Sequence, residues 1–290
     1  MSTTTAKSTV SPVFRCDDVM DTNGSDVSTD KVRAFLEDAD RDEHNHVILV
    51  SSAMVYGAWE NNPSPLSEDD VVRPVPSFTY AVTCLTAEAL VEQWRTLHPG
   101  RSATILRPAP VVVPSGNSRL VLALAHAVSG ESTGSVMSAQ FLHFDDLESA
   151  IALSQMIKPD GVFNVAPDGA INGERLGELA AQPLRVKLPS WARDVIDVLR
   201  WRLQRGPIPP GLRQYTRHSW VVSNEKLRAL GWAPRVSNEE AYVEGTAGSW
   251  ISTLSAKRRQ ELSLAGMAVG GAAFIALIFA VVRRVRRARR

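Results

Sequence analysis

Residues 46–57, with the sequence HVILVSSAMVYG, are the stretch that decides the fold. Residues 47–50 form an unbroken apolar run, which is typical of a strand buried on both faces of a parallel sheet. In open α/β proteins such strands direct their carboxyl ends toward ligands. Ser51 and Ser52 follow this strand directly, so the sequence predicts that their hydroxyls lie at a binding edge.

The segments around this strand continue an α/β pattern. A capped helix is expected at about residues 28–40, with Val32, Phe35 and Leu36 on one face. Thr79 caps a second helix from Tyr80 to about His98, which ends at Pro99 and Gly100. Its predicted buried stripe is Leu85, Ala89, Leu90 and Trp94. The opening strand is expected at residues 46–51, and further strands at residues 102–106, 140–144 and 161–166. Further helices are expected at residues 120–128, 146–156, 189–205, 224–230 and 237–254.

Five short motifs resemble the extended short-chain dehydrogenase/reductase family, the NAD-dependent epimerases and dehydratases of nucleotide sugars. They stand in the order found in that family and extend the resemblance over roughly residues 46–240. The motifs are VSSAMVYG at 50–57, YAVTCLTAE at 80–88, ILRP at 105–108, FLHFDDL at 141–147 and GVFNVA at 161–166.

The resemblance implies a catalytic role for two hydroxyls. Ser52 stands at the place of the hydrogen-bonding serine, and Tyr80 at the place of the acid/base tyrosine. In the family a lysine four residues after the tyrosine lowers its pKa, but here that residue is Cys84. A tyrosine has a pKa of about 10 in water and needs a nearby cation to ionise near neutrality, so redox activity is expected to be weak or lost.

The same resemblance assigns the remaining candidate site residues. Ser51, Cys84 and Arg107 are assigned to an NAD or NADP cofactor, and Asn164 with Arg107 to the substrate. From chemistry alone, Arg107 can clamp a phosphate bidentately or lie solvated beside a loop, and Asn164 can bind a ligand or cap a turn. Asp145 and Asp146 are expected to cap the helix that follows them. With His143 as the one neighbouring histidine, no metal site is predicted.

A glycine-rich phosphate turn is missing from the sequence. The first glycine is Gly24 and the second is Gly57, whereas members of the family begin with a strand and a glycine-rich turn that binds pyrophosphate. Either the true start lies upstream of Met1, or the dinucleotide site has been lost. In the second case the strand at residues 46–51 would lie at a sheet edge and invite pairing with another chain.

Charge is distributed unevenly along the chain. The formal net charge is +1, but residues 283–290 contain six arginines, so the body is acidic and no nucleic-acid partner is expected. Leu262 to Val282 is an uncharged stretch of sufficient length to cross a bilayer, and Gly266 and Gly270 hint at a homodimer. A basic helix beginning near Trp191 fits either a lipid surface or a packed subdomain.

The predicted fold class is therefore α/β: a partial Rossmann-like, mostly parallel sheet, a small mixed C-terminal subdomain and a C-terminal transmembrane helix. The predicted domains are a disordered or loosely packed N-terminus at 1–27, the Rossmann-like domain at 28–170, the substrate-type subdomain at 171–255 and a membrane anchor at 256–290. The expected localisation is a single-pass C-terminal anchor with the main domain in the cytoplasm and membrane lipids as partners.

Three functions are compatible with these features. The first is an epimerase or dehydratase-like enzyme acting on a nucleotide sugar or a lipid-linked substrate, with a sterol-dehydrogenase-like membrane enzyme as its variant. The second is a membrane-tethered module that keeps the sheet for binding or scaffolding. The third is an oligomerising membrane anchor in which only the C-terminal helix and tail matter.

Overall fold

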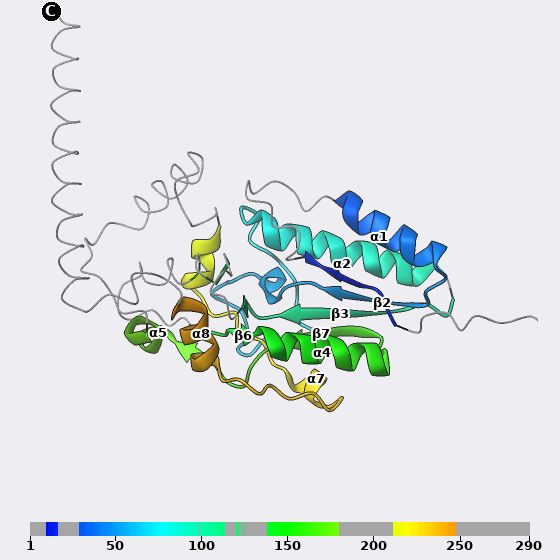
Figure 1. The fold of residues 1–290 in the computed structure, drawn as a ribbon. Coiled ribbons are helices and arrows are strands. Elements are labelled where there is room, and N and C mark those ends of the chain that lie inside the picture. Colours follow the sequence, from blue (N-terminus) through cyan, green and yellow to red (C-terminus); the bar gives the residue numbers. More distant parts are fainter. Residues whose placement is uncertain are drawn as a thin grey trace, which may run out of the picture.

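The centre of the protein is a four-stranded parallel sheet with the strand order β1-β2-β3-β7. The computed structural model describes residues 10–16, 29–97, 99–113, 120–121, 124, 138–179 and 211–247. The sheet consists of β1 (Val13–Arg15), β2 (His46–Val50), β3 (Ser102–Pro108) and β7 (Gly161–Val165). All five residues of β2 are buried. The predicted α/β class and the parallel, Rossmann-like sheet are thus confirmed (Figure 1).

Strand β1 was not predicted from the composition of the N-terminal stretch. It pairs in parallel with β2, with Val13 opposite Ile48. Phe14 packs against Phe35 with ring centroids 5.3 Å apart, and the Arg15 guanidinium lies 5.9 Å from the centre of the Phe144 ring. Strand β2 is consequently an interior strand, and not the edge strand expected if the strands that flank it had been lost. A three-residue strand lacks a clear period, so only its tertiary contacts reveal it.

Helices cover both faces of the sheet. Figure 1 shows α1 (Thr29–Arg41) and α2 (Thr79–Leu97) on one side and α4 (Phe144–Ile157) on the other. Helix α1 forms where the apolar period predicted it, because Val32 and Leu36 are buried and Phe35 packs against the core. Both α1 and α2 lie within two residues of their predicted bounds.

The buried face of α2 differs from the predicted stripe. Ala89 is exposed and Leu85 is half-buried, whereas Cys84 and Glu88 are buried. The predicted stripe was therefore confirmed at Trp94 and wrong at Ala89, and the buried face is rotated toward Cys84 and Glu88. The reason is Glu88, whose carboxylate pairs with a buried arginine on β3, since hydrophobic periodicity alone assigns a glutamate to the solvent side.

The first turn of α4 is capped by His143 and not by an aspartate. His143 Nδ1 accepts the Asp145 amide hydrogen at 3.2 Å. Asp146, by contrast, is buried and accepts the backbone N–H groups of Arg235 at 2.9 Å and Val236 at 3.1 Å. The predicted capping role of Asp146 was wrong because its carboxylate is needed to hold a segment almost ninety positions later in the chain.

Short elements form a mixed region beside the sheet. β4 (Val111–Val112) pairs in parallel with β6 (Leu142–His143), and β5 (Ser138–Ala139) pairs antiparallel with β8 (Ile171–Asn172). The remaining elements are α5 (Gly173–Leu179), η3 (Leu212–Thr216), α7 (Glu225–Arg228) and α8 (Asn238–Ala247). The domain boundary at residues 170 and 171 stays a prediction.

The predicted transmembrane helix and single-pass anchor were wrong for this structure. In the part of the chain that the structure describes, no helix combines the length and the apolar character needed to cross a bilayer. The longest of these helices, α2, has 19 residues and includes Glu88, Glu92 and Arg95, which a bilayer core would reject. Residues 262–282 and the basic helix near Trp191 lie outside the described residues.

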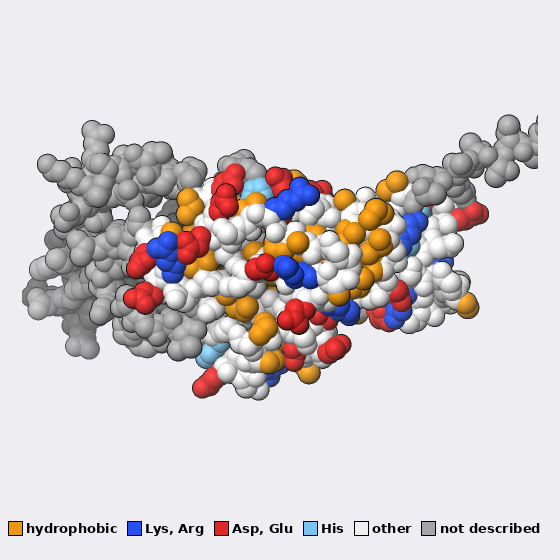
Figure 2. Space-filling view, turned by 90° about the horizontal axis from the view of Figure 1, so that it is seen from below, with side chains coloured by type: hydrophobic (Ala, Val, Ile, Leu, Met, Phe, Trp, Pro, Cys, Tyr) orange, Lys and Arg blue, Asp and Glu red, His pale blue; other side chains and the backbone are white. Residues whose placement is uncertain are grey.

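The surface carries charges of both signs. On the face shown in Figure 2, acidic and basic side chains alternate among apolar ones over the described residues. Several of these charges pair locally, as Arg175 does with Glu239 at 2.9 Å. This face has no basic field of the kind that binds a nucleic-acid backbone.

Candidate functional site

The carboxyl ends of the parallel strands bring distant polar residues together. In the register of β3 and β7, Arg107 lies opposite Asn164, and Val50 of β2 lies opposite Leu106 of β3. Ser51 extends this pairing, because its amide donates to the Leu106 carbonyl at 2.7 Å. The sheet therefore collects Ser51, Arg107 and Asn164 at the edge where open α/β folds bind ligands.

Glu88 of α2 lies at this edge and forms a buried ion pair with Arg107. Arg107 Nε donates to Glu88 Oε1 at 3.1 Å, and Nη2 donates to Oε2 at 2.7 Å. The same Oε1 accepts the Ser51 hydroxyl at 2.6 Å. The pairing is bidentate, which fixes the guanidinium plane as well as its position. A phosphate could use Arg107 only by displacing Glu88.

Tyr56 extends the network to the third strand. Its hydroxyl accepts Arg107 Nη1–H at 2.8 Å and donates to Asn164 Oδ1 at 3.0 Å. The backbone N–H of Asn164 donates to Glu68 Oε1 at 2.7 Å. Tyr56, Asn164 and Ser51 are all fully buried. We call Ser51, Tyr56, Glu88, Arg107 and Asn164 the edge network.

Burial and charge set the protonation states of this network. Burial on its own lowers the pKa of Arg107, but the Glu88 carboxylate outweighs burial, so the Arg107 pKa lies above its ordinary value. Burial raises the pKa of Tyr56, although Arg107 opposes the shift. The guanidinium is therefore charged and the phenol neutral at physiological pH. Such an arrangement holds the strand ends rigidly.

The two predicted catalytic hydroxyls lie on neighbouring elements. Ser52 Oγ accepts the Met54 amide hydrogen at 3.2 Å and caps the short helix η2 (Ala53–Tyr56). Accepting this bond leaves the serine O–H able to donate. Tyr80 lies in the first turn of α2, which packs against η2, and its ring centroid is 5.7 Å from that of Phe78. The joint catalytic role of Ser52 and Tyr80 stays a prediction.

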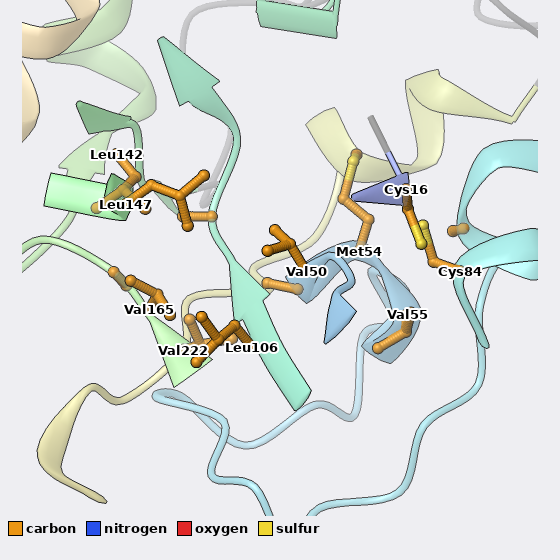
Figure 3. Packing of buried hydrophobic residues seen from close by; sticks show 14 of the residues in the cluster. Cys16, Val50, Met54, Val55, Cys84, Leu106, Leu142, Leu147, Val165 and Val222 are labelled. Carbon is orange, nitrogen blue, oxygen red and sulfur yellow. The ribbon is translucent and has the colours of Figure 1, made fainter. Parts of the chain in front are cut away.

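Cys84 lies one helical turn after Tyr80 and has no solvent exposure. Its side chain points into the apolar cluster beneath α2 (Figure 3). Buried thiols behave as small hydrophobic groups. The position of the catalytic lysine in the similar family is thus occupied by an uncharged, packed side chain.

Sequence reasoning missed Glu88 and Tyr56 as members of this site. Both belong to motifs quoted for the resemblance, but neither was assigned a role. One signal was available: Tyr80, Cys84 and Glu88 repeat at intervals of four and so share one helix face. A helix face that holds two candidate site residues makes a third one worth testing.

The fold and its edge define a Rossmann-like α/β protein. Residues 26–166 match the model of the NAD dependent epimerase/dehydratase family. The resemblance predicted from the sequence is therefore confirmed for this segment of the chain. An uncharacterized protein of Mycobacterium tuberculosis (strain H37Rv) is 25% identical over 225 residues, which are 77% of this chain. The chain spans 59% of the length of this curated relative.

Solved structures share the fold at low sequence identity. UDP-glucose 4-epimerase of Thermus thermophilus, in complex with NAD, matches with a TM-score of 0.51 and 19% identity over 75% of this chain and 68% of its own. UDP-glucose 4-epimerase of Thermotoga maritima, with UDP-glucose, matches with a TM-score of 0.52 and 21% identity over 75% of this chain and 67% of its own.

Two glycines near the candidate site pack against the protein itself. Two glycines with positive φ leave no room for a Cβ atom, which is the usual mark of a close backbone approach. At Gly57 such an atom would meet the Arg73 carbonyl at 2.4 Å, and at Gly211 it would meet the Phe78 amide nitrogen at 2.7 Å. Other atoms of the protein thus fill the space next to both glycines, and neither glycine leaves room for a phosphate. Cys84 supplies no cation for the nicotinamide ribose.

Proposed function

We propose that this protein binds a nucleotide sugar at the carboxyl edge of its parallel sheet, and that its NAD(P)-linked epimerase or dehydratase activity is weak or lost. The epimerase/dehydratase domain and the neighbours that hold NAD or UDP-glucose support the ligand class. The edge network supports the position, because it stabilises the strand ends on which such a ligand would rest.

The observation that carries the loss of activity is the buried thiol of Cys84. An acid/base tyrosine must reach a pKa near the working pH. The family achieves this with an ammonium group one turn after the tyrosine. A neutral thiol in an apolar cluster exerts no comparable field on Tyr80. Proton transfer by Tyr80 is consequently slow, whereas hydrogen bonding by its hydroxyl is retained.

Within this proposal the two hydroxyls act as ligand contacts. Ser52 and Tyr80 hydrogen-bond the hydroxyl groups of the sugar. Arg107 and Asn164 act from beneath as positioning residues, because their polar atoms are already engaged inside the protein. The assignment of Ser51 and Cys84 to a cofactor is not part of the proposal.

Calorimetric titration of the full chain tests the proposal. We expect UDP-glucose to bind saturably and NAD to bind no more tightly than about millimolar, which corresponds to about −4 kcal/mol. Tight NAD binding together with turnover of the nucleotide sugar would show an active enzyme. Failure of both ligands would favour the alternative, a non-catalytic interaction module.

Two variants separate ligand contacts from general effects. Ser52→Ala and Tyr80→Phe should each weaken UDP-glucose binding by roughly 3- to 10-fold, the effect of one hydrogen bond. Thr86→Ala is the matched control, because Thr86 is exposed on the same helix and its hydroxyl donates to the Val82 carbonyl. Equal binding by all three variants would place the sugar elsewhere.

A further inference from the structure

The chain contains two cysteines, Cys16 and Cys84, and both are fully buried thiols that form no disulfide in this structure. They come from elements far apart in the sequence, the end of β1 and the middle of α2. Two buried thiols in a chain of 290 residues are ordinary when they lie apart. Their relative position therefore decides whether they have a function.

The strand register places Cys16 beside the edge network. Arg15 lies opposite Val50 in the parallel pairing of β1 and β2. The next residues along the two strands, Cys16 and Ser51, therefore lie next to one another at the same end of the sheet. Neighbouring strands are about 4.8 Å apart, so Cys16 is one strand away from a residue that contacts α2.

The helical repeat of α2 places Cys84 near the same end of the sheet. Ser51 donates its hydroxyl to Glu88 of α2 at 2.6 Å. Cys84 precedes Glu88 by four residues, so the two side chains lie on the same face, one turn of about 5.4 Å apart. The face of α2 that contacts Ser51 thus also presents Cys84 toward the end of β1.

Figure 3 shows the outcome of these two constraints. In this view the side chains of Cys16 and Cys84 point toward one another, in the region of Met54 and Val55 of η2. All four residues belong to the same buried apolar cluster. The two thiols therefore face each other in a region closed to solvent.

We propose that Cys16 and Cys84 are a redox pair that forms a reversible disulfide linking β1 to α2. The oxidant is a low-molecular-weight disulfide such as oxidised glutathione. The thiolate of one cysteine attacks a sulfur of the oxidant and releases one glutathione thiol. The second cysteine then displaces the other glutathione thiol from the mixed disulfide. Two protein thiols are oxidised to one disulfide, one glutathione disulfide is reduced to two thiols, and the protons pass to the released thiolates.

The expected consequence is a stiffer site. Strand β1 has three residues and pairs with β2 at the edge of the described sheet. A covalent link would attach this strand to the helix that begins at Thr79 and carries Tyr80. Closing a chain loop of this length is expected to raise Tm by roughly 5–10 °C. The inference does not depend on which ligand the protein binds.

The test is oxidation of the folded full-length chain in glutathione buffers of rising oxidising power. Intact mass after alkylation should show loss of two hydrogen atoms, and peptide mapping should locate one bond between Cys16 and Cys84. The Tm should rise as expected and return after treatment with dithiothreitol. Because both thiols are buried, the reaction is expected to be slower than that of glutathione with a short cysteine peptide.

Two variants and the mass of the oxidised wild-type protein test the proposed disulfide. Cys16→Ala and Cys84→Ala should each lose the oxidation-dependent Tm shift and acquire only glutathione. Circular dichroism establishes that each variant is folded. Recovery of both thiols unmodified from folded wild-type protein under oxidising conditions would overturn the inference, and so would disulfides formed only between two molecules. The wild-type measurement decides even if a variant fails to fold.

Discussion

Arg107 and Glu88 form a bidentate ion pair inside the protein, with Nη2–Oε2 at 2.7 Å and both side chains almost fully buried. This pair joins β3 to α2 and accepts the Ser51 hydroxyl. It also explains why α2 turns a glutamate toward the sheet. A charge at this position is tolerated because its partner and its other hydrogen bonds are already in place.

Breaking this pair should destabilise the fold strongly. We expect Arg107→Ala to lower the free energy of unfolding by about 3–5 kcal/mol, because it leaves the Glu88 carboxylate buried without its cation. Urea denaturation measures the change. The matched control is Arg95→Ala, which removes a half-exposed arginine paired with Glu92 and Asp160 and should cost no more than about 1 kcal/mol. Equal effects of the two variants would contradict the structural role of Arg107.

His46 should make the stability of the protein depend on pH. Its ring nitrogens lie 2.8 Å from Ser11 Oγ and 3.0 Å from Thr104 Oγ1, and burial lowers its pKa from the ordinary value of 6.5. Between the lowered pKa and about 6.5 the unfolded chain binds more protons than the folded one, so stability rises with pH there. The contribution is complete above about pH 6.5 and is lost as the pH falls below it.

Thermal unfolding between about pH 5 and pH 8 measures this dependence. We expect His46→Gln to flatten the lower part of the profile. It should also lower the overall stability by about 1–3 kcal/mol, because the Ser11 and Thr104 hydroxyls lose their hydrogen bonds to the imidazole. His44→Gln is the control for removal of a histidine from the same region. An unchanged pH profile in His46→Gln would assign the dependence to another group.

Asp146 should hold the C-terminal segment against α4. Its two carboxylate oxygens accept the backbone N–H groups of Arg235 and Val236. Asp146→Ala leaves both donors unsatisfied, so we expect a loss of about 2–4 kcal/mol and faster hydrogen exchange at these two amides. Asp145→Ala, at the exposed neighbouring position, should change neither quantity by much. Retained protection of the two amides in Asp146→Ala would show that the contact is dispensable.

Replacement of Cys84 by lysine should not simply restore an enzyme. Position 84 is closed to solvent, so an ammonium there is expected to cost roughly 3–5 kcal/mol of stability. Cys84→Ala is the size-reducing control and should cost about 1 kcal/mol. Urea denaturation gives both values, and NAD-linked turnover of UDP-glucose is measured in parallel. A stable Cys84→Lys variant that gains turnover would reveal an otherwise intact catalytic site.

The sequence by itself determined the elements whose pattern is local. The apolar run of β2, the amphipathic period of α1 and the stop after α2 each depend on residues close together in the chain, so their bounds follow from periodicity and caps. The ordered motifs likewise determined the family resemblance. Neither inference requires knowledge of which elements meet in space.

Tertiary structure alone decided the buried polar contacts. Glu88 faces the core because Arg107 lies there, and Asp146 is buried because two amides near residue 235 need an acceptor. Strand β1 forms because it pairs with the edge of β2. In each case a distant partner compensates the free energy of desolvating a polar or short segment, and local propensity contains no information about that partner.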